Sequence, residues 1–535
     1  MKLFRAACCL LLAAWAGLAQ DDSEALGEIR GQAVSAHSGK ALPGVQVSLR
    51  SAQTGPSLNQ LSREAHSGFD GRYAFADLAP GEYILRIAKS GYEGDQQVSR
   101  QVEVSELDPV TKLDLQLRPS ASIAGRVLDS DGDPLPDTPV VLYHWESTMG
   151  RSVLRYVRSS HSDDRGLYRL WGLLPNDYVL AALPTALPAA RGRWVQEMSP
   201  AFYPSALGPR GGSVLKVRWG QHLEGVDLRV EAAKETSLEG VVVEAPAGVA
   251  CVDCRLNVLS PAGAMLGAIG VESNGAFSLR GFPSGRYLIV AENRRRLRGT
   301  AEVTLVRGKE TLLRLEVGES SAVAGRVIAE DVPLDPSAPV DAASTVNVQL
   351  SGDPVENGRF RRATRPAPGE GGRFLLEAVP PGRYLLSILR GGGGAAGYLR
   401  GAMLGGRPLS GPEIEVPPGR TLEGLEVRVG FDGGQLNGRA VADELPPQGV
   451  VVALPDDYGE GFSFGHLGAF RGGDGLFEIP NLPPGRYRLF AVARNNRFDL
   501  GNPRTRQFLR HEGKRVQVSP NETATIDVPF IADPD

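Results

Sequence analysis

The sequence predicts an all-β protein that is built as a tandem array of five Greek-key β-sandwiches. Three observations predict this architecture. A sequence motif with two turns, here called the two-turn phrase, is repeated along the chain, and short strands with alternating apolar residues surround each copy. No amphipathic helical stretch of useful length interrupts them. The first copy of the phrase reads Asp70-Gly71-Arg72-Tyr73 and then Pro80-Gly81-Glu82-Tyr83. The last copy reads Asp474-Gly475-Leu476-Phe477 and then Pro484-Gly485-Arg486-Tyr487.

The spacing of the two turns is the same in every copy. The turn glycine and the later glycine are ten residues apart in four copies: Gly71 to Gly81, Gly275 to Gly285, Gly372 to Gly382 and Gly475 to Gly485. In the second copy Asn176 takes the later position, ten residues after Gly166. Because a fixed step between turns fixes the register of the strands, a repeated step predicts a repeated fold.

Each repeat opens with a strand that carries a glycine at its centre. These strands contain Ile29-Arg30-Gly31, Ile123-Ala124-Gly125, Leu238-Glu239-Gly240, Val323-Ala324-Gly325 and Leu436-Asn437-Gly438. Glycine inside a strand usually marks a bend or the close approach of another backbone segment. In the first repeat a second strand follows, with Val45, Val47 and Leu49 on one face. The tyrosine after the second turn, such as Tyr83, lies where its hydroxyl can bond back to the loop backbone.

Turn signals at close spacing divide the chain into sandwiches of several short strands each. We expect these sandwiches at residues 27–118, 119–231, 232–317, 318–430 and 431–532. The joints between them are short, and some carry proline, as at Arg118-Pro119-Ser120. Such joints favour a semi-rigid rod over modules on flexible linkers.

Residues 1–19 are interpreted as a secretory signal peptide. Lys2 and Arg5 precede an apolar run, and Gly17-Leu18-Ala19 supplies the small residues of a cleavage site. The run is too short to span a bilayer, which needs about 20 apolar residues, and no later stretch is apolar enough. We therefore expect an exported protein without a membrane span, located in the periplasm, on the cell surface or outside the cell. The formal net charge of −4 gives no reason to expect a nucleic-acid partner.

The motifs of the first repeat resemble those of a known family. Ile29-Arg30-Gly31, Leu42-Pro43-Gly44-Val45, Asp70-Gly71-Arg72-Tyr73, Pro80-Gly81-Glu82-Tyr83 and Gly91-Tyr92 are similar to the pattern of the carboxypeptidase regulatory-like domain. The resemblance covers nearly all of the mature chain and implies immunoglobulin-like or transthyretin-like sandwiches of exported bacterial type. By analogy of fold it also implies carbohydrate binding. Related Cna B-type domains can join a first-strand lysine to a last-strand asparagine, but none of the five first strands here contains a lysine.

The sequence offers no catalytic residues and no metal site, so we expect neither enzyme activity nor a cofactor. A metallocarboxypeptidase needs zinc ligands in a His-x-x-Glu pattern, and none of the seven histidines begins one. The loop Asp129-Ser130-Asp131-Gly132-Asp133 is either a plain turn or a calcium loop. The turn is favoured, because calcium loops usually place the glycine after the third aspartate.

Cys251 and Cys254 are the cysteines of the mature chain, and an oxidising compartment favours a disulfide between them. Residues three apart in an extended strand lie about 10 Å from each other, which is too far for a bridge. The bond therefore needs a turn at Val252-Asp253. A redox site is disfavoured because the sequence around the pair has no βαβ pattern.

The second repeat differs from the others in its aromatic residues. All four tryptophans of the mature chain lie in it (Trp145, Trp171, Trp194 and Trp219), and Tyr203 belongs to an insertion at about residues 187–212. These five residues are the candidate ligand-binding residues, because flat aromatic faces with polar neighbours suit sugars. The alternative, which we favour, is that the insertion folds back and its aromatic residues form a second small core.

The sequence therefore predicts an exported, non-enzymatic protein that acts as a binding or scaffold module, with a polysaccharide or a cell-envelope protein as its partner. The alternative is a purely structural envelope component or an accessory subunit that binds a protein partner. An exposed tryptophan cluster in the second repeat would favour the binding function, and a buried cluster would favour the structural one.

Overall fold

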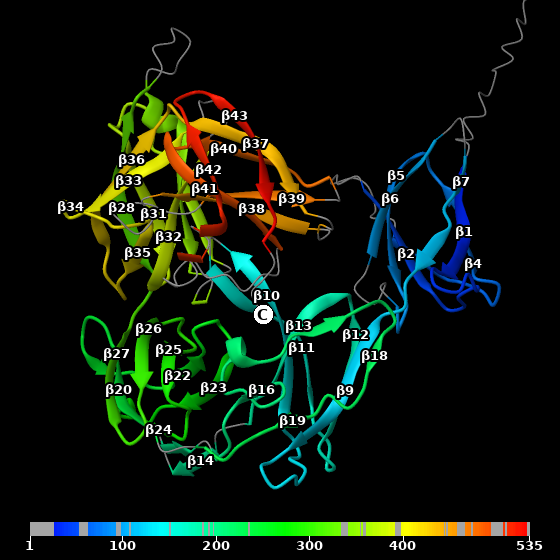
Figure 1. The fold of residues 1–535 in the computed structure, drawn as a ribbon, viewed down its shortest axis with the longest axis horizontal. Helices are drawn as coiled ribbons and strands as arrows, with labels where there is room; N and C mark the ends of the chain where they lie inside the picture. The colour runs from blue at the N-terminus through cyan, green and yellow to red at the C-terminus, as the bar shows by residue number, and fades with distance from the viewer. Residues whose placement is uncertain are drawn as a thin grey trace, which may run out of the picture. The chain divides into compact units, whose positions relative to one another are not determined.

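The computed structural model gives the fold of the chain from residue 26 onward (Figure 1). The described residues are 26–52, 62–92, 98–105, 109–148, 151–184, 187–190, 193–195, 197–233, 236–332, 341–353, 355–356, 360–390, 397–442, 445, 448–456, 466–471, 474–493, 507–508 and 511–531. The predicted signal peptide at residues 1–19 lies outside them.

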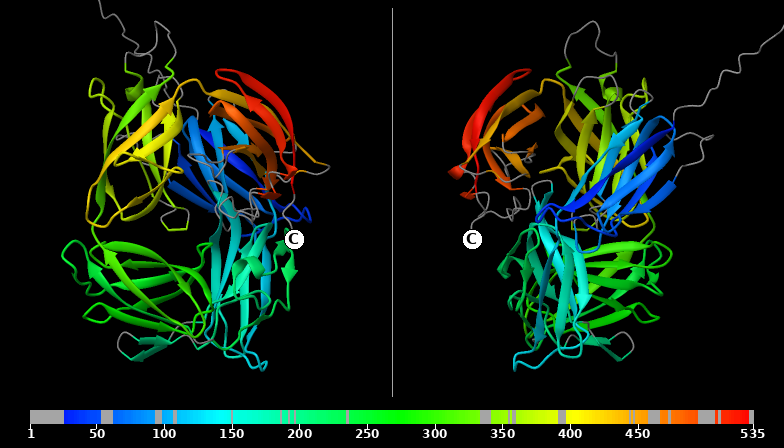
Figure 2. Two further views of the ribbon diagram at one scale, coloured as in Figure 1. Left: turned by 60° about the vertical axis from the view of Figure 1, so that its left-hand side comes forward. Right: turned by 90° about the vertical axis from the view of Figure 1, so that its right-hand side faces the viewer.

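The fold is all-β and consists of five β-sandwiches, each made of two sheets, which confirms the predicted fold class (Figure 2). One compact unit of the chain contains the first sandwich together with Trp171–Leu174 and Trp219–Gln221 of the second, and the other unit contains the rest of the second sandwich and the third, fourth and fifth. The limits of the individual sandwiches stay a prediction. In the described part of the chain, the short 3-10 helices η2 (Pro209–Gly211) and η3 (Ala342–Thr345) lie among the strands, and residues 507–508 and 511–512 are helical. Within the described ranges, no helix has the length and apolar character needed to cross a membrane.

The first sandwich contains β1 (Gly27–Ser35), β2 (Gln46–Ser51), β3 (Ser62–His66), β4 (Arg72–Leu78), β5 (Gly81–Ala88), β6 (Val98–Val104), β7 (Val110–Lys112) and β8 (Leu115–Leu117). One sheet has the order β4-β1-β7, with β8 also paired to β1, and the other has the order β3-β2-β5-β6. The first strand is antiparallel to β4 and parallel to β7 and β8. The other sandwiches repeat this arrangement of first, fourth and last strands.

The second sandwich contains β9 (Ala121–Leu128), β10 (Pro139–Thr148), β11 (Arg151–His161), β12 (Leu167–Leu173), β13 (Asn176–Ala182), β16 (Ala201–Phe202), β17 (Leu215–Val217), β18 (His222–Leu223) and β19 (Leu228–Arg229). Its sheets are β12-β9-β18, joined by β19, and β11-β10-β13-β16, joined by β17. The insertion adds the hairpin β14 (Leu187–Ala190) and β15 (Arg193–Val195).

The third sandwich contains β20 (Ser237–Glu244), β21 (Val249–Ala250), β22 (Arg255–Leu259), β23 (Met265–Gly270), β24 (Ala276–Arg280), β25 (Gly285–Glu292), β26 (Arg298–Leu305) and β27 (Glu310–Val317). One sheet has the order β23-β22-β25-β26. The other has the order β14-β15-β24-β20-β21, with β27 on β20, so the insertion hairpin of the second sandwich extends a sheet of the third.

The fourth sandwich contains β28 (Ser321–Glu330), β29 (Val346–Gly352), β30 (Arg361–Thr364), β31 (Arg373–Val379), β32 (Gly382–Arg390), β33 (Tyr398–Leu404), β34 (Arg407–Pro408), β35 (Glu413–Val416) and β36 (Leu422–Gly430). The fifth contains β37 (Gly434–Val441), β38 (Gln448–Pro455), β39 (His466–Arg471), β40 (Leu476–Leu482), β41 (Gly485–Ala493), β42 (Lys514–Val518) and β43 (Thr523–Pro529). Their sheets are β31-β28-β36-β33-β34 with β30-β29-β32-β35, and β40-β37-β43 with β39-β38-β41-β42.

The central glycine of each first strand allows another backbone segment to approach closely, as predicted. A Cβ atom on Gly31 would lie 1.8 Å from the carbonyl oxygen of Leu113. The same contact with a backbone carbonyl late in the repeat recurs at Gly125, Gly240, Gly325 and Gly438. The hydroxyl of Tyr73, from the Asp-Gly-Arg-Tyr phrase, donates to that Leu113 oxygen at 2.6 Å. The tyrosine of the two-turn phrase and the central glycine of the first strand therefore both contact the Leu113 carbonyl oxygen.

The tyrosine after the second turn also makes its predicted bond. The hydroxyls of Tyr83, Tyr287, Tyr384 and Tyr487 each donate to the backbone carbonyl of the residue four positions earlier. These bonds satisfy the phenol groups inside otherwise apolar cores and tie each turn to the following strand.

One sheet of the second sandwich is buried on both faces. Consecutive residues Val140, Val141, Leu142 and Tyr143 of β10 are all at most 9% exposed. Of these, Val141 and Tyr143 join a hydrophobic core with residues of the third sandwich, among them Leu256. Strands that are buried on both faces read as continuous apolar runs rather than as an alternation.

Candidate ligand cleft and contacts between sandwiches

Trp145 lies in a core rather than on a surface. It is 2% exposed on β10 and belongs to the core that the second and third sandwiches share. Arg210 of the insertion lies over its ring, with the guanidinium carbon 5.5 Å from the ring centroid. The indole Nε1 is buried and has no hydrogen-bond partner in the described part of the chain. The structure thus gives Trp145 the position expected of a core residue.

The remaining aromatic candidates are dispersed. Trp171 is 49% exposed and lies on β12, in the sheet opposite the one that contains Trp145. Trp219 and Tyr203 are half-buried, and Arg118 lies over the Trp219 ring at 5.4 Å. The backbone of Trp194 on β15 pairs with Leu279 of β24, and its side chain is outside the described part. The structure does not bring Trp145 and Trp171 to one surface, and the ligand role of the five residues stays a prediction.

A cleft lies beside the hairpin of β10 and β11. It has a volume of about 710 Å³ and is lined by Tyr143, Glu146, Arg155, Tyr156, Leu183 and Met265. Tyr143 and Tyr156 oppose each other in the register of the two strands, so both side chains are on one face. Tyr143 is buried, whereas Tyr156 is 63% exposed and Met265, from the third sandwich, is 49% exposed.

Polar groups stand at the same cleft. Arg155 Nε donates to Glu146 Oε2 at 2.7 Å, and the two side chains are 31% and 26% exposed. The Tyr156 hydroxyl and the Ser159 hydroxyl are 3.1 Å apart. Burial, and then the neighbouring Tyr156, raises the pKa of the Tyr143 phenol. The cleft combines an exposed ring, an apolar wall and a neutralised charge pair.

Sequence reasoning did not identify this cleft. The tryptophans drew attention to the second repeat, but the cleft uses its tyrosines and a methionine of the next repeat. One signal was available: the unbroken apolar runs at 140–143 and 178–183 indicate a sheet with two buried faces and hence a neighbour packed on it.

Cys251 and Cys254 form a disulfide, with their Cα atoms 5.8 Å apart. Between them, Asp253 has a positive φ of 60°, so the chain turns at Val252-Asp253. Both cysteines are buried in the third sandwich. The bond closes the turn that leads into β22, and this position fits a structural role.

The third and fourth sandwiches meet through a charged cluster. Arg383 Nη1 of β32 donates to Glu302 Oε1 of β26 at 2.6 Å, and its Nε donates to Glu356 Oε2 at 3.2 Å. The Glu356 side chain is fully buried. Arg298 Nη2 of the third sandwich donates to the Glu356 carbonyl oxygen at 2.8 Å. Asp353 and the two glutamates raise the pKa of Arg383 despite its burial, so the cation is held by the surrounding acids.

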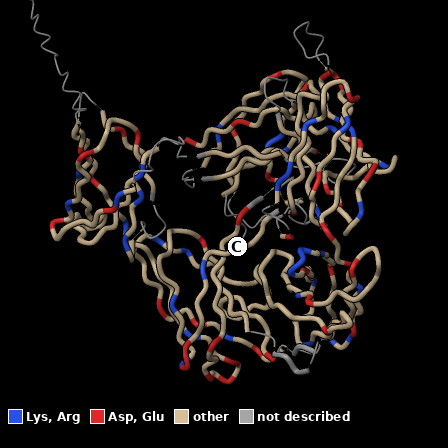
Figure 3. The backbone as a smooth tube through the Cα atoms, turned by 180° about the vertical axis from the view of Figure 1, so that it is seen from behind, with Lys and Arg blue, Asp and Glu red and all other residues tan. Residues whose placement is uncertain are grey.

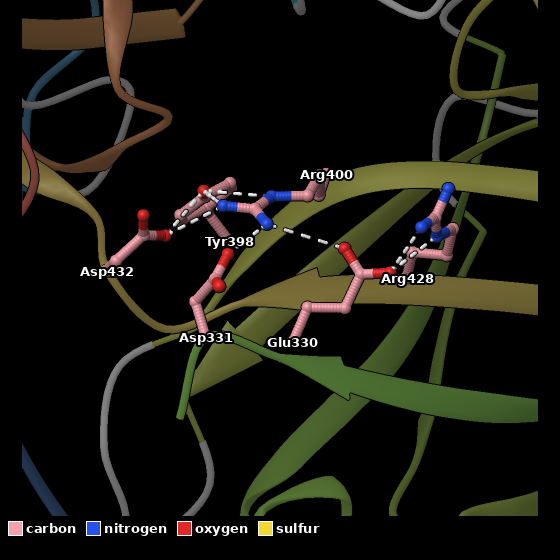
Figure 4. Close-up of polar contacts among 6 residues, drawn as sticks. All are labelled: Glu330, Asp331, Tyr398, Arg400, Arg428 and Asp432. Carbon is pink, nitrogen blue, oxygen red and sulfur yellow. Dashed lines mark hydrogen bonds and ion pairs between the residues drawn. The ribbon is translucent and has the colours of Figure 1, made fainter. Parts of the chain in front are cut away.

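A second charged cluster lies where β36 leads into the fifth sandwich (Figure 4). Arg400 of β33 forms ion pairs with Asp331 and Asp432, the latter at 2.9 Å, and its Nη2 lies 2.6 Å from the Tyr398 hydroxyl. The Tyr398 hydroxyl donates to Asp432 Oδ1 at 2.7 Å. Glu330 links Arg400 to a second arginine of the same cluster, Arg428. Arg400 thus contacts acidic residues at the end of β28 and an acidic residue in the loop between β36 and β37.

The charged groups of these clusters pair with one another across the joints. Within the described ranges, no group of three or more His, Cys, Asp or Glu side chains is arranged to hold a metal ion. In the aspartate-rich loop, the Asp129 carboxylate accepts the backbone N–H groups of Asp131 and Asp133, both at 2.9 Å, as in a plain turn. Elsewhere, basic and acidic residues are interspersed along the strands (Figure 3).

Three comparisons describe what the chain is similar to. No curated protein matches it. Matches among solved structures include the minor pilin GBS52 of Streptococcus agalactiae, at 14% identity and a TM-score of 0.23, covering 38% of this chain and 96% of that one. The major pilin subunit BcpA of Bacillus cereus is 12% identical, with a TM-score of 0.16, covering 55% and 99% of the two chains. Residues 28–118 match the carboxypeptidase regulatory-like domain, which confirms the resemblance for the first sandwich.

Proposed function

We propose that the chain is an exported, non-enzymatic scaffold protein whose second to fifth sandwiches are fixed to one another and present a recognition surface. The observation that supports this most directly is the set of contacts between sandwiches. The second and third share a core, Arg383 bridges Glu302 and Glu356 between the third and fourth, and Arg400 reaches Asp432 at the next joint. Such contacts would be of no use in modules that move independently.

The partner in this proposal is a polysaccharide or a protein of the cell envelope. A scaffold with this role needs export, which the predicted signal peptide at residues 1–19 would provide. It also needs side-chain contacts that hold neighbouring sandwiches together, and the ion pairs of Arg383 and Arg400 are such contacts. A purely structural role without a ligand remains the alternative, and the cleft beside Tyr156 favours the binding role over it.

Small-angle X-ray scattering of the mature chain tests the scaffold. Arg383→Met should broaden the distribution of interatomic distances, because it leaves Glu302 and the buried Glu356 without their cation. Arg326→Met is the matched control, since Arg326 pairs with Glu426 inside the fourth sandwich. Equal scattering from wild type and both variants, with profiles that fit independently moving modules, would refute the scaffold. A leader that is retained and uncleaved in the producing cell would refute export.

A further inference from the structure

We propose that the cleft of Tyr143, Glu146, Arg155, Tyr156, Leu183 and Met265 binds a carbohydrate chain, with a sugar ring stacked on Tyr156. This inference rests on the proposed function, because it names the ligand class of the recognition surface. It also relocates the ligand site within the second repeat, from the tryptophans to a tyrosine pair that packs beside the third sandwich.

The exposed tyrosine is fixed in place before any ligand arrives. Tyr156 leaves 63% of its surface in solvent, although it stands opposite the buried Tyr143 on neighbouring strands. Its hydroxyl is engaged with Ser159 at 3.1 Å, so the polar end of the ring is already satisfied. What the ring offers is its flat apolar face, and a ring held in one orientation loses little entropy on binding. The C–H face of a pyranose is a flat apolar surface of matching kind.

A charge pair stands at the edge of the cleft, where Arg155 pairs with His144 and Glu146 with Val153, so both side chains start from the face of the hairpin opposite to the tyrosines. Arg155 and Glu146 are bonded to each other at 2.7 Å but keep 31% and 26% of their side chains exposed. Guanidinium N–H groups can donate to sugar hydroxyl oxygens, and carboxylate oxygens can accept from sugar hydroxyls. Since the two charges cancel, the pair favours a neutral glycan over a polyanion.

The size and the walls of the cleft fit a short segment of such a chain. Its volume of about 710 Å³ lies in the range of small-molecule sites, which is roughly 300–1,000 Å³. An extended peptide that adds to the edge of β11 is the competing ligand, since Met265 and Leu183 supply apolar walls. The backbone N–H of Leu154 on that edge already donates to Ala262 O at 2.7 Å, which closes the edge beside the cleft to strand addition.

Isothermal titration calorimetry of the mature chain with defined hexasaccharides tests the site. The probes are the neutral maltohexaose, cellohexaose, xylohexaose and chitohexaose, the acidic hexagalacturonate, and an alanine–leucine hexapeptide. We expect at least one neutral hexasaccharide to bind. Tyr156→Ala should weaken that binding by about tenfold or more, while Tyr156→Phe, which keeps the ring face, should stay within about twofold. Phe69→Ala, at an exposed aromatic residue of the first sandwich, should leave the affinity unchanged.

Several outcomes would overturn the proposal. Absence of binding to every saccharide, equal binding by Tyr156→Ala, loss of binding in Phe69→Ala, or a preference for the hexapeptide or hexagalacturonate would each do so. The scaffold is judged separately, because scattering of the Tyr156→Ala variant should match wild type whether or not the sugar binds. A negative titration with wild-type scattering therefore rejects the ligand class and leaves the scaffold intact.

Discussion

At the residue scale, the contact between a first-strand glycine and a late strand determines how closely the strands of each sandwich pack. The Cβ atom that Gly325 lacks would lie 2.2 Å from the Leu425 carbonyl oxygen and 2.7 Å from the Phe374 ring. Both distances are shorter than any ordinary van der Waals contact, so a side chain at this position would push two strands apart. The glycine is therefore required by space rather than by its backbone angles.

Gly325→Ala and Gly401→Ala form a matched pair of substitutions in the fourth sandwich. We expect Gly325→Ala to destabilise that sandwich by about 2–3 kcal/mol through overpacking. An added Cβ on Gly401 would meet only the Arg428 side chain, at 4.0 Å. Gly401→Ala should therefore change the stability by at most about 1 kcal/mol, in the stabilising direction. Hydrogen exchange of the fourth sandwich measures both free energies of opening, and equal effects would contradict the prediction.

Alkaline pH should loosen the joint near Tyr398. Burial, and then the hydrogen bond to Asp432, raises the pKa of Tyr398 to about 12, above the ordinary value of 10.0. The unfolded chain therefore loses this proton at lower pH than the folded chain does. The stabilisation is complete below pH 10 and is lost as the pH rises towards about 12. Near-ultraviolet titration of tyrosinate in wild type and Tyr398→Phe measures this, and a missing late-ionising group in wild type would contradict it.

Local residue patterns were predictable, and residues whose role depends on a distant partner were not. The bond of Tyr83 to its own loop follows from its place after a turn, and sequence reasoning found it. The burial of Trp145 depends on Arg210 and on residues of the third sandwich, far away along the chain. No local pattern contains that information, so Trp145 could be named as a candidate but not placed.

At the scale of elements, the sheet that contains β10 and β13 differs from the sheets of the first sandwich. In β5 of the first sandwich, buried and more exposed residues alternate along the strand. In β13, five consecutive residues from Tyr178 to Ala182 are buried. A sheet with two buried faces needs two neighbours, and here the second neighbour is the third sandwich.

Val179→Ala should therefore disturb two sandwiches at once. Val179 is fully buried and belongs to the core shared with Leu256 and Ile289 of the third sandwich. We expect a loss of about 1–3 kcal/mol, seen as faster hydrogen exchange in both β13 and β25. Leu350→Ala is the control, because the core around Leu350 contains no residue of the second or third sandwich. An effect of Val179→Ala that is confined to the second sandwich would refute the shared core.

The strands of each repeat were predicted from the sequence, but the neighbour that covers the second face of the sheet with β10 and β13 was not. The spacing of Gly275 and Gly285 is enough to predict a hairpin, because turn residues act locally. The run from Val140 to Tyr143 signals burial on both sides, yet it cannot name what covers the second side. The residues of β22 and β25 that cover it are ordinary core residues in sequence terms.

At the scale of the whole molecule, the joints within the second unit are of two physical kinds. The second and third sandwiches are joined by apolar burial. The joint between the third and fourth uses Arg383 with Glu302 and Glu356, and the next one uses Arg400 with Asp432. Apolar burial is insensitive to salt screening, whereas partly exposed ion pairs weaken as ionic strength rises.

High salt should therefore weaken the joints made by ion pairs and leave the joint made by apolar burial intact. At about 1 M salt the Debye length falls to about 3 Å, so the Arg383–Glu302 pair is largely screened. We expect limited proteolysis to cut more rapidly at the joint at residues 318–320, and to leave the second and third sandwiches together as one fragment. Digestion products that do not change with salt would contradict this assignment of the joints.

The number and order of the sandwiches could be predicted from the sequence, because each copy of the two-turn phrase marks one of them. Their mutual contacts could not. Arg383 and Glu302 are 81 positions apart, and each looks like an ordinary surface charge in its own strand. The cleft beside Tyr156 was missed for the same reason, since Met265 reaches it from another repeat.

The sheet with two buried faces also limits how the sandwiches can be rearranged. The core of the fourth sandwich includes no residue of the second or third, so separating it from them would leave that core intact. Cutting the chain between the second and third would uncover Val141, Tyr143 and their partners, and fragments of that kind tend to aggregate. For shuffling, truncation or fusion, the smallest transferable part of this region is therefore the second and third sandwiches taken as a pair.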